Sequence, residues 1–282
     1  MNFKTGKRST KKIAIYIILA ITSLIIIIPI FWVLGNSFRV TTQIGQYTDL
    51  SLRLFLPDKI TFDNYKILFT DYPFLRYIWN TVFVAVTVTV VSLLLNSMAA
   101  FSFARINFIG KKVIFPLLLV TLIVPGEVML LPSYLLIKNL GLMDNYLALI
   151  LPALGGAFGI FYLRQSFLGI PKELEEAAAI DGSGRTGIFL RIYLPLVKPH
   201  LITLGLMTFI GQWDGFIWPL TVLTTPDKYL VQVGLNYLTG EHYSDWGAIF
   251  AGAMLCTLPI IIIFICLQKY YIQGIASSGI KG

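Results

Sequence analysis

The sequence predicts an all-α membrane protein with six transmembrane helices. Of its 282 residues, 56% are hydrophobic and only 13% are charged, and the mean hydropathy is +0.78. Soluble domains carry about 25% charged and roughly 45–50% apolar residues. Helices and closed barrels alone satisfy every backbone group in lipid, and the long apolar runs lack the alternation of barrel strands. A soluble enzyme, a disulfide scaffold and a disordered chain are therefore excluded.

The apolar runs are each long enough to cross a hydrocarbon core, which takes about 20 helical residues. We place the spans at 13–34, 80–104, 113–137, 145–166, 201–223 and 247–269. The first run follows a basic tail at 1–12, but it is too long for a signal peptide and no small-x-small cleavage site closes it. We therefore expect a retained span and a single transmembrane domain over 13–282.

The distribution of Lys and Arg predicts the orientation. Basic residues favour the cytoplasmic side, and they are densest in the N-terminal tail, the connection after the second span and the 167–200 connection. We therefore expect both termini in the cytoplasm of a bacterial or archaeal cell. The connection at 35–79 then faces outward, where it either caps a pore, meets an external partner or merely joins two spans.

Neither cysteine nor histidine chemistry is indicated. Cys256 and Cys266 fall in the last apolar run and are typical of small buried hydrophobes rather than of a disulfide. His200 and His242 are far apart in sequence. We expect no metal site and no catalytic residues.

The 167–200 connection carries the most specific pattern. Pro171 suits a helix start, and glutamates at 173, 175 and 176 favour the positive end of that helix. Leu174, Ala177, Ala178 and Asp181 recur at helical spacing, and Gly182 predicts the stop. The small side chains allow close approach of a partner protein. An interfacial helix on the membrane is the alternative, but an anionic surface would repel the glutamates.

This loop resembles the EAA loop of ATP-binding-cassette importer permeases. The matching positions are Glu176-Ala177-Ala178, Asp181-Gly182, Phe189, Ile192, Leu194-Pro195 and Pro199. Trp213-Asp214 with Trp218-Pro219, and the Gly-Ile-Lys-Gly end, extend the likeness to the sugar-type permeases of the maltose and glycerol-phosphate group. Ser183 and Asp214 depart from the usual Ala and Asn.

The resemblance implies a type I importer transmembrane domain and a set of partners. The ATPase-coupling residues would be Leu174, Glu176, Ala177, Ala178, Asp181 and Gly182. The partners would be a homologous second permease, two ATPase subunits and an external solute-binding protein. ATP and Mg²⁺ would bind to the ATPase, and this chain would hold no cofactor. The stretch Gly182–Gly187 matches only half of a P-loop, because Ile188 and Phe189 replace the Lys and the hydroxyl residue.

Polar residues at membrane depth are costly, at roughly 2.5–3.5 kcal/mol for a central carboxylate, and they suggest a function. Glu127 follows Pro125-Gly126, and Gln212, Asp214 and Gly215 interrupt the fifth span, as expected where a helix breaks beside a water-filled cavity. The candidate translocation-path residues are Asn96, Glu127, Gln212, Trp213 and Asp214. Alternatively, the carboxylates pair with a partner and the tryptophans only pack.

The predicted function is a carbohydrate-importer permease. A permease for glycerol-phosphate or another small polar solute is the nearest alternative, and the sugar is not specified by this chain. A secondary transporter would favour paired broken segments or repeats, and a membrane enzyme would cluster a nucleophile and a base. We find neither pattern. The end of the chain, from Gln273, is expected to be a flexible tail.

Overall fold

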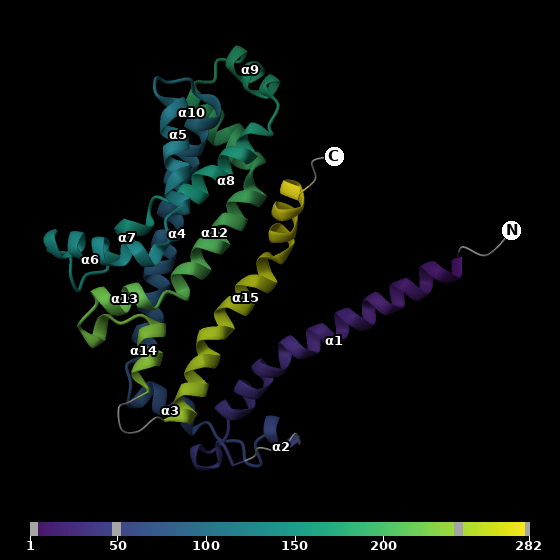
Figure 1. Ribbon diagram of the computed structural model, residues 1–282, viewed down its shortest axis with the longest axis vertical. Helices are drawn as coiled ribbons and strands as arrows, with labels where there is room; N and C mark the ends of the chain where they lie inside the picture. The colour runs from purple at the N-terminus through teal and green to yellow at the C-terminus, as the bar shows by residue number, and fades with distance from the viewer. Residues whose placement is uncertain (1–4, 47–51, 240–244, 280–282) are drawn as a thin grey trace. The chain divides into compact units, whose positions relative to one another are not determined.

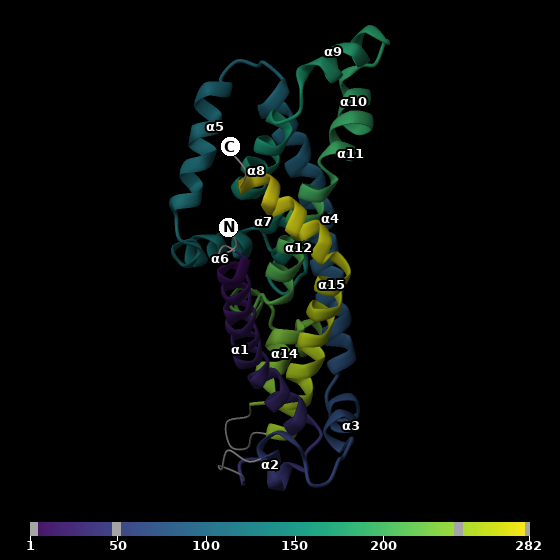
Figure 2. The ribbon, with the colours of Figure 1, turned by 90° about the vertical axis from the view of Figure 1, so that its right-hand side faces the viewer.

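The computed structural model describes residues 5–46, 52–239 and 245–279, with side chains from residue 12 to 269 within these ranges (Figures 1 and 2). No β-strand occurs among these residues, and helices follow one another throughout. Among the described residues, three helices are long and apolar enough to span a membrane. If each of three bent helix pairs also counts as one span, the number of spans is as many as six. The predicted all-α membrane class is confirmed.

The chain divides into two compact units. The first contains Met1–Phe74 and Leu235–Leu258, and the second contains Leu75–Gly234 and Pro259–Gly282.

The first unit is built around one long apolar helix and a folded connection. Its elements are α1 (Thr5–Ser37), η1 (Thr41–Gln43), α2 (Leu52–Phe55), α3 (Asp63–Thr70) and the first part of α15 (Trp246–Gly279). The most apolar stretch of α1 is exposed along its whole length. Buried Asn64 donates to the carbonyls of Ser37 and Arg39, at 2.9 and 2.8 Å, so the chain is tied down directly after α1. Residues 35–46 and 52–70, which the structure describes within the 35–79 connection, are therefore folded.

The second unit holds the rest of the helices. They are α4 (Phe74–Arg105), α5 (Lys111–Val120), η2 (Thr121–Ile123), η3 (Gly126–Met129), α6 (Leu130–Asn139), α7 (Leu147–Ala153), α8 (Ala157–Leu168), α9 (Lys172–Ile180), α10 (Arg185–Ile188), the π-helical turn η4 (Phe189–Tyr193), α11 (Leu194–Leu196), α12 (Lys198–Trp213), α13 (Ile217–Val222), η5 (Pro226–Lys228) and α14 (Val231–Tyr237). Within this unit α4 and α12 lie side by side (Figures 1 and 2), with Gly205 against Leu93.

The third and fifth expected spans are interrupted where the sequence places Pro, Gly and polar residues. The chain bends by 98° between η2 and η3. Val124 is extended there, because the residue before Pro125 avoids the helical region. In the fifth span, α12 ends at Trp213 and a new helix, α13, begins at Ile217. The helix breaks expected at both places are confirmed.

The last helix runs further than we expected. Helix α15 continues to Gly279, so the flexible tail predicted from Gln273 is wrong as far as Gly279. Extending an existing helix costs far less than nucleating a new one, and this favours continuation through small residues. Residues 280–282 lie outside the described residues.

An aromatic cluster forms the core at one end of the second unit. Phe101 of α4, Phe167 of α8 and Tyr193 of η4 are buried against one another, with ring centroids 5.1 to 6.1 Å apart. Ile188 and Phe189 add the 185–193 segment to the same cluster, and Leu204 adds α12. The 167–200 loop is thus anchored to α4, α8 and α12 by apolar packing.

Buried polar side chains of α4 bind backbone groups that helices leave unpaired. Asn80 donates to the carbonyls of Asp227 and Tyr229, at 2.9 and 3.0 Å. The Thr81 hydroxyl accepts a hydrogen bond from the amide of Val231 at 2.8 Å. Since an unpaired buried backbone group is costly, these contacts hold the non-helical segment before α14 against α4.

Asp144 fastens two connections of the second unit. It has a positive φ of 55°, and its carboxylate accepts hydrogen bonds from the amides of Thr224 and Thr225 and from the Thr225 hydroxyl. Lys228 Nζ lies 2.8 Å from the same carboxylate. Burial alone would raise the pKa of Asp144, but these hydrogen bonds together outweigh burial and lower the pKa below its ordinary value of 3.8.

We predict that Gly234→Ala destabilises the protein. A Cβ at this position would lie 2.1 Å from Cδ2 of Tyr77, whose ring is buried and cannot move aside easily. Overpacking of this kind costs about 1–3 kcal/mol. Thermal unfolding in detergent should show a lower midpoint for this variant. Gly155→Ala is the control, because its Cβ meets no atom within 4 Å; equal midpoints for both variants would contradict the packing.

We predict a pH-dependent effect of Asp144→Asn. The lowered pKa keeps Asp144 ionised in the folded protein, so its contribution to stability is fully present above the ordinary pKa of 3.8. It is lost as the pH falls through the folded pKa. At pH 7 the variant should unfold about 1–3 °C lower than the parent, because loss of the charge weakens the partly exposed pair with Lys228 and its neighbouring hydrogen bonds by about 1 kcal/mol in total. The difference should persist down to about pH 4 and shrink only in stronger acid. A difference that vanished between pH 7 and 5 would contradict this assignment.

Candidate functional site

Two places in the second unit combine unusual backbone with exposed or cavity-lining residues. The first is helix α9 and the turn after it. Its start follows from Pro171, which has extended backbone, and from Glu173 and Glu175 in the first turn. Its end is a Schellman motif: Gly182, with φ of +82°, donates to the carbonyl of Ala179, and the amide of Ser183 donates to that of Ala178. Only glycine adopts this φ without strain.

The expected coupling residues of α9 do not all lie on one face of the helix: one packs against the unit and the others are exposed. Ala178 is half-buried and packs against the aromatic cluster. Leu174, Glu176, Ala177, Asp181 and Gly182 are exposed, and Ile180 beside them is 86% exposed. Leu174, Ala177 and Ile180 form an apolar stripe at i, i+3, i+6 spacing on a helix that projects at one end of the second unit (Figure 1). Ile180 was missed from the sequence, although its spacing from Ala177 was available.

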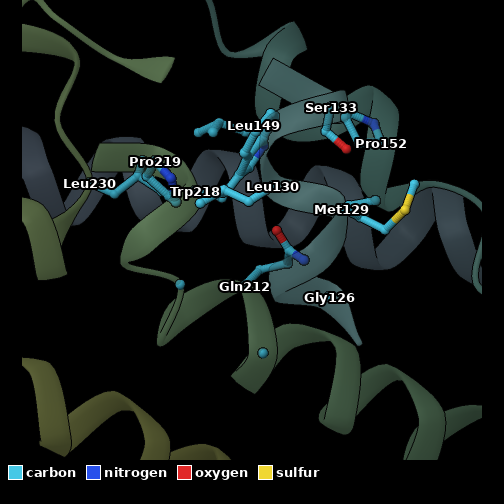
Figure 3. Close-up of a pocket in the computed structure, with 13 residues that line it drawn as sticks. Gly126, Met129, Leu130, Ser133, Leu149, Pro152, Gln212, Trp218, Pro219 and Leu230 are labelled. Atoms are coloured by element: carbon cyan, nitrogen blue, oxygen red, sulfur yellow. The ribbon is translucent and has the colours of Figure 1, made fainter. Parts of the chain in front are cut away.

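The second place is a cavity of about 320 Å³ between the broken helices. Gly126 and Met129 of η3, Leu130 and Ser133 of α6, and Gln212 at the end of α12 line it. Leu149 and Pro152 of α7, with Trp218 and Pro219 of α13, form further walls. Figure 3 shows the Gln212 amide projecting from the end of α12 toward Leu130 and Trp218. Both interruptions expected from the sequence therefore open onto one cavity.

The cavity walls are held by a hydrogen bond between two short helices. The indole Nε1 of Trp218 donates to the carbonyl of Ala148 at 3.0 Å, linking α13 to α7. Pro152 prevents a regular continuation of α7, and the chain bends by 41° between α7 and α8. The volume lies within the range of about 300–1,000 Å³ that is usual for small-molecule sites.

The polar groups in the cavity are neutral. Gln212 and Ser133 supply side-chain donors and acceptors, and none of the described residues that line the cavity is charged. Such a lining suits a solute that carries hydroxyl groups better than an ion. Ser133 was missed from the sequence: the break at Pro125-Gly126 was expected, but the sequence alone does not indicate which residues beyond the break face the cavity.

The candidate path residues are only partly brought together. Gln212 lines the cavity, and Glu127 follows Gly126 at its edge but is itself exposed. Asp214 is exposed and is not among the lining residues. Trp213 is buried and stacks on Phe209, with centroids 5.8 Å apart.

Asn96 lies elsewhere, at the break between α7 and α8. It is buried, and its side-chain oxygen accepts a hydrogen bond from the amide of Gly156 at 3.3 Å. Its amide nitrogen packs so closely on Gly159 that a Cβ there would be 2.6 Å away. The geometry gives Asn96 a structural role at this break.

The fold and these two sites define a class: a helical membrane protein with a neutral cavity between broken helices and a projecting helix at one end. A family model described as "binding-protein-dependent transport system inner membrane component" matches residues 92–277. The chain belongs to this family of permease subunits.

Relatives of almost equal length support this membership. The arabinooligosaccharides transport system permease protein AraQ of Halalkalibacterium halodurans is 34% identical, with 98% of this chain and 100% of the relative covered. The maltodextrin transport system permease protein MdxG of Bacillus subtilis is 32% identical over 100% of both chains. The lactose transport system permease protein LacG of Rhizobium radiobacter is 28% identical over 97% and 98%.

A solved structure agrees with the fold. One chain of a bacterial ABC transporter involved in the import of the acidic polysaccharide alginate superposes with a TM-score of 0.84 at 26% identity. The superposition includes 96% of this chain and 100% of the alginate transporter chain. The membership inferred from the loop motif, an ABC importer permease of the carbohydrate group with the type I fold, is confirmed.

We predict that Gln212→Leu weakens solute uptake by the assembled transporter. The substitution keeps most of the side-chain volume but removes the amide from the cavity. Loss of one hydrogen bond of about 0.5–1.5 kcal/mol should raise KM roughly two- to tenfold. Gln165→Leu, exposed on α8 and outside the cavity, is the matched control.

An unchanged KM for Gln212→Leu would remove this residue from the path. Asp214→Ala belongs in the same assay. Unchanged affinity and rate in that variant would count against a path role for Asp214.

Proposed function

We propose that this chain forms half of the translocation pathway of an ATP-driven carbohydrate importer in a bacterial or archaeal cell membrane. It spans the membrane several times, with both termini in the cytoplasm. It pairs with a homologous second permease and works with two ATPase subunits and an external solute-binding protein. Substrate moves by alternating access: closure of the ATPases draws the projecting helices together and opens the cavity outward, and hydrolysis resets it.

The observation that carries the proposal is the projecting helix α9. Its apolar stripe of Leu174, Ala177 and Ile180 is exposed, although the same helix is anchored to the aromatic cluster through Ala178. Exposed apolar stripes mark interaction surfaces. The glutamates at 173 and 176 are also exposed and would be repelled by an anionic membrane surface. A protein partner therefore fits α9 better than lipid does.

The chain itself performs no covalent reaction in this proposal. ATP and Mg²⁺ are bound by the ATPase, and this chain holds no cofactor. The stretch from Gly182 to Gly187 builds a helix stop and the short helix α10, whose N-cap is Gly184. It has no Lys or hydroxyl residue where a P-loop needs them to hold phosphates and Mg²⁺.

Carbohydrate is the substrate class that the cavity and the relatives favour. The relatives named above include transporters of arabinooligosaccharides, maltodextrin and lactose. The uncharged lining, with Gln212 and Ser133 as its polar side chains, suits neutral hydroxyl groups. Glycerol-phosphate would need a cation for its phosphate, so the lining favours a neutral sugar.

Ala177→Arg is predicted to abolish uptake without preventing membrane insertion. A long charged side chain would stand on the exposed stripe of α9 and block close approach of the ATPase. Gly182→Pro should act similarly, because Pro fixes φ near −65° and Gly182 has a φ of +82°. The measurement is ATP-dependent sugar uptake by proteoliposomes, together with co-purification of the ATPase.

The control is Leu56→Arg, which places the same charge at another exposed apolar residue outside α9. Normal ATPase co-purification and normal transport by both α9 variants would remove the coupling assignment. Full-speed uptake by this polypeptide alone, with no ATPase present, would overturn the proposed function itself.

A further inference from the structure

Among the described residues, one side-chain hydrogen bond joins the projecting helix α9 to the core of its unit. The Tyr193 hydroxyl donates to Oε2 of Glu175 at 2.8 Å. Glu175 lies on the side of α9 that faces the unit, and Tyr193 is fully buried in the π-helical turn η4. Two contacts of α9 with the aromatic cluster are seen among the described residues: the apolar packing of Ala178 and this hydrogen bond.

Tyr193 is in turn held by residues of α4 and α8. Its ring packs edge-on against Phe101 of α4 and Phe167 of α8. The guanidinium of Arg105, the last residue of α4, lies over the same ring, 5.1 Å from its centroid. A cation in this position attracts the face of the ring, so Tyr193 is fixed from three sides.

Arg105 also binds the end of α8. Its Nη2 donates to the carbonyl of Phe167 at 2.6 Å and to the carbonyl of Ile170. These carbonyls lie at and just beyond the C-terminus of α8, where a helix has unpaired acceptors and favours a cation. Arg105 therefore joins the ends of α4 and α8 to each other and to Tyr193.

We propose that Glu175, Tyr193 and Arg105 are positioning residues that form a mechanical joint, through which displacement of α9 by the ATPase is transmitted to α4 and α8. This inference rests on the proposed function. The apolar cluster makes the joint stiff. The Tyr193–Glu175 bond restricts the direction in which α9 can move relative to the cluster, because hydrogen bonds weaken steeply when stretched or bent. Breaking this bond lets α9 move without displacing α4 and α8.

The decisive variant is Tyr193→Phe in the complete transporter reconstituted in liposomes. It keeps the ring, its packing and its contact with Arg105, and removes only the hydroxyl. Glu175→Ala removes the acceptor, whereas Glu175→Gln keeps an oxygen that can accept the same bond. Glu173→Ala, an exposed carboxylate on the same helix, is the matched control.

The measurement is the ratio of sugar molecules transported to ATP molecules hydrolysed. Tyr193→Phe and Glu175→Ala should lower this ratio about two- to tenfold, the range for one hydrogen bond. The yield of assembled complex and the KM for ATP should stay unchanged. Glu175→Gln should retain most of the ratio, and the double variant should be no worse than either single one.

The joint is overturned if both single variants keep the wild-type ratio, or if Glu175→Gln is as impaired as Glu175→Ala. It is also overturned if the variants lose assembled complex, since the bond would then serve folding alone. These outcomes differ from failure of the proposed function, in which the wild-type complex itself would show no ATP-dependent uptake.

Discussion

Backbone groups that lose their helical partners inside a membrane must find others, and the second unit is arranged around this requirement. Three polar side chains of α4 bind backbone groups in two of the segments that interrupt the helices of this unit. Asn80 and Thr81 bind the segment around Tyr229, and Asn96 binds Gly156 at the break between α7 and α8. Helix α4 is thus both a long apolar span and a row of hydrogen-bonding positions for its interrupted neighbours.

The same requirement determines where a solute could pass. Non-helical backbone at membrane depth is tolerated where it is buried in protein or lines a cavity. The breaks at Pro125-Gly126 and at Asp214-Gly215 meet at one cavity, and Trp218 holds its wall by bonding to Ala148. Interrupting the helices therefore provides space and polar groups together, without placing a charge in the lining.

The helix breaks and the projecting helix α9 could be predicted from the sequence, because Pro and Gly determine the conformation of the backbone at their own positions. The exact cavity lining could not. Asn96 and Gln212 are both polar residues inside apolar runs, yet one binds backbone and the other faces the cavity. This difference depends on which helix packs beside each residue, and a single sequence holds no such information. Ser133 was missed for the same reason, since its place in the lining depends on how α6 packs after the bend. Ile180 is a different case, because its helical spacing from Ala177 was available in the sequence.

Helix α12 connects the two sites within this unit. In its first half, Leu204 belongs to the aromatic cluster that holds Tyr193, and at its end Gly211 and Gln212 line the cavity. Its 16 residues give a length of about 24 Å at 1.5 Å per residue. A packed helix resists bending more than an interrupted segment does, and α12 is interrupted at both ends, by the 77° bend before Lys198 and by the break at Asp214. A displacement at the cluster would therefore reach Gln212 as a movement of the whole helix, and the residues that hold the cluster would govern the shape of the cavity.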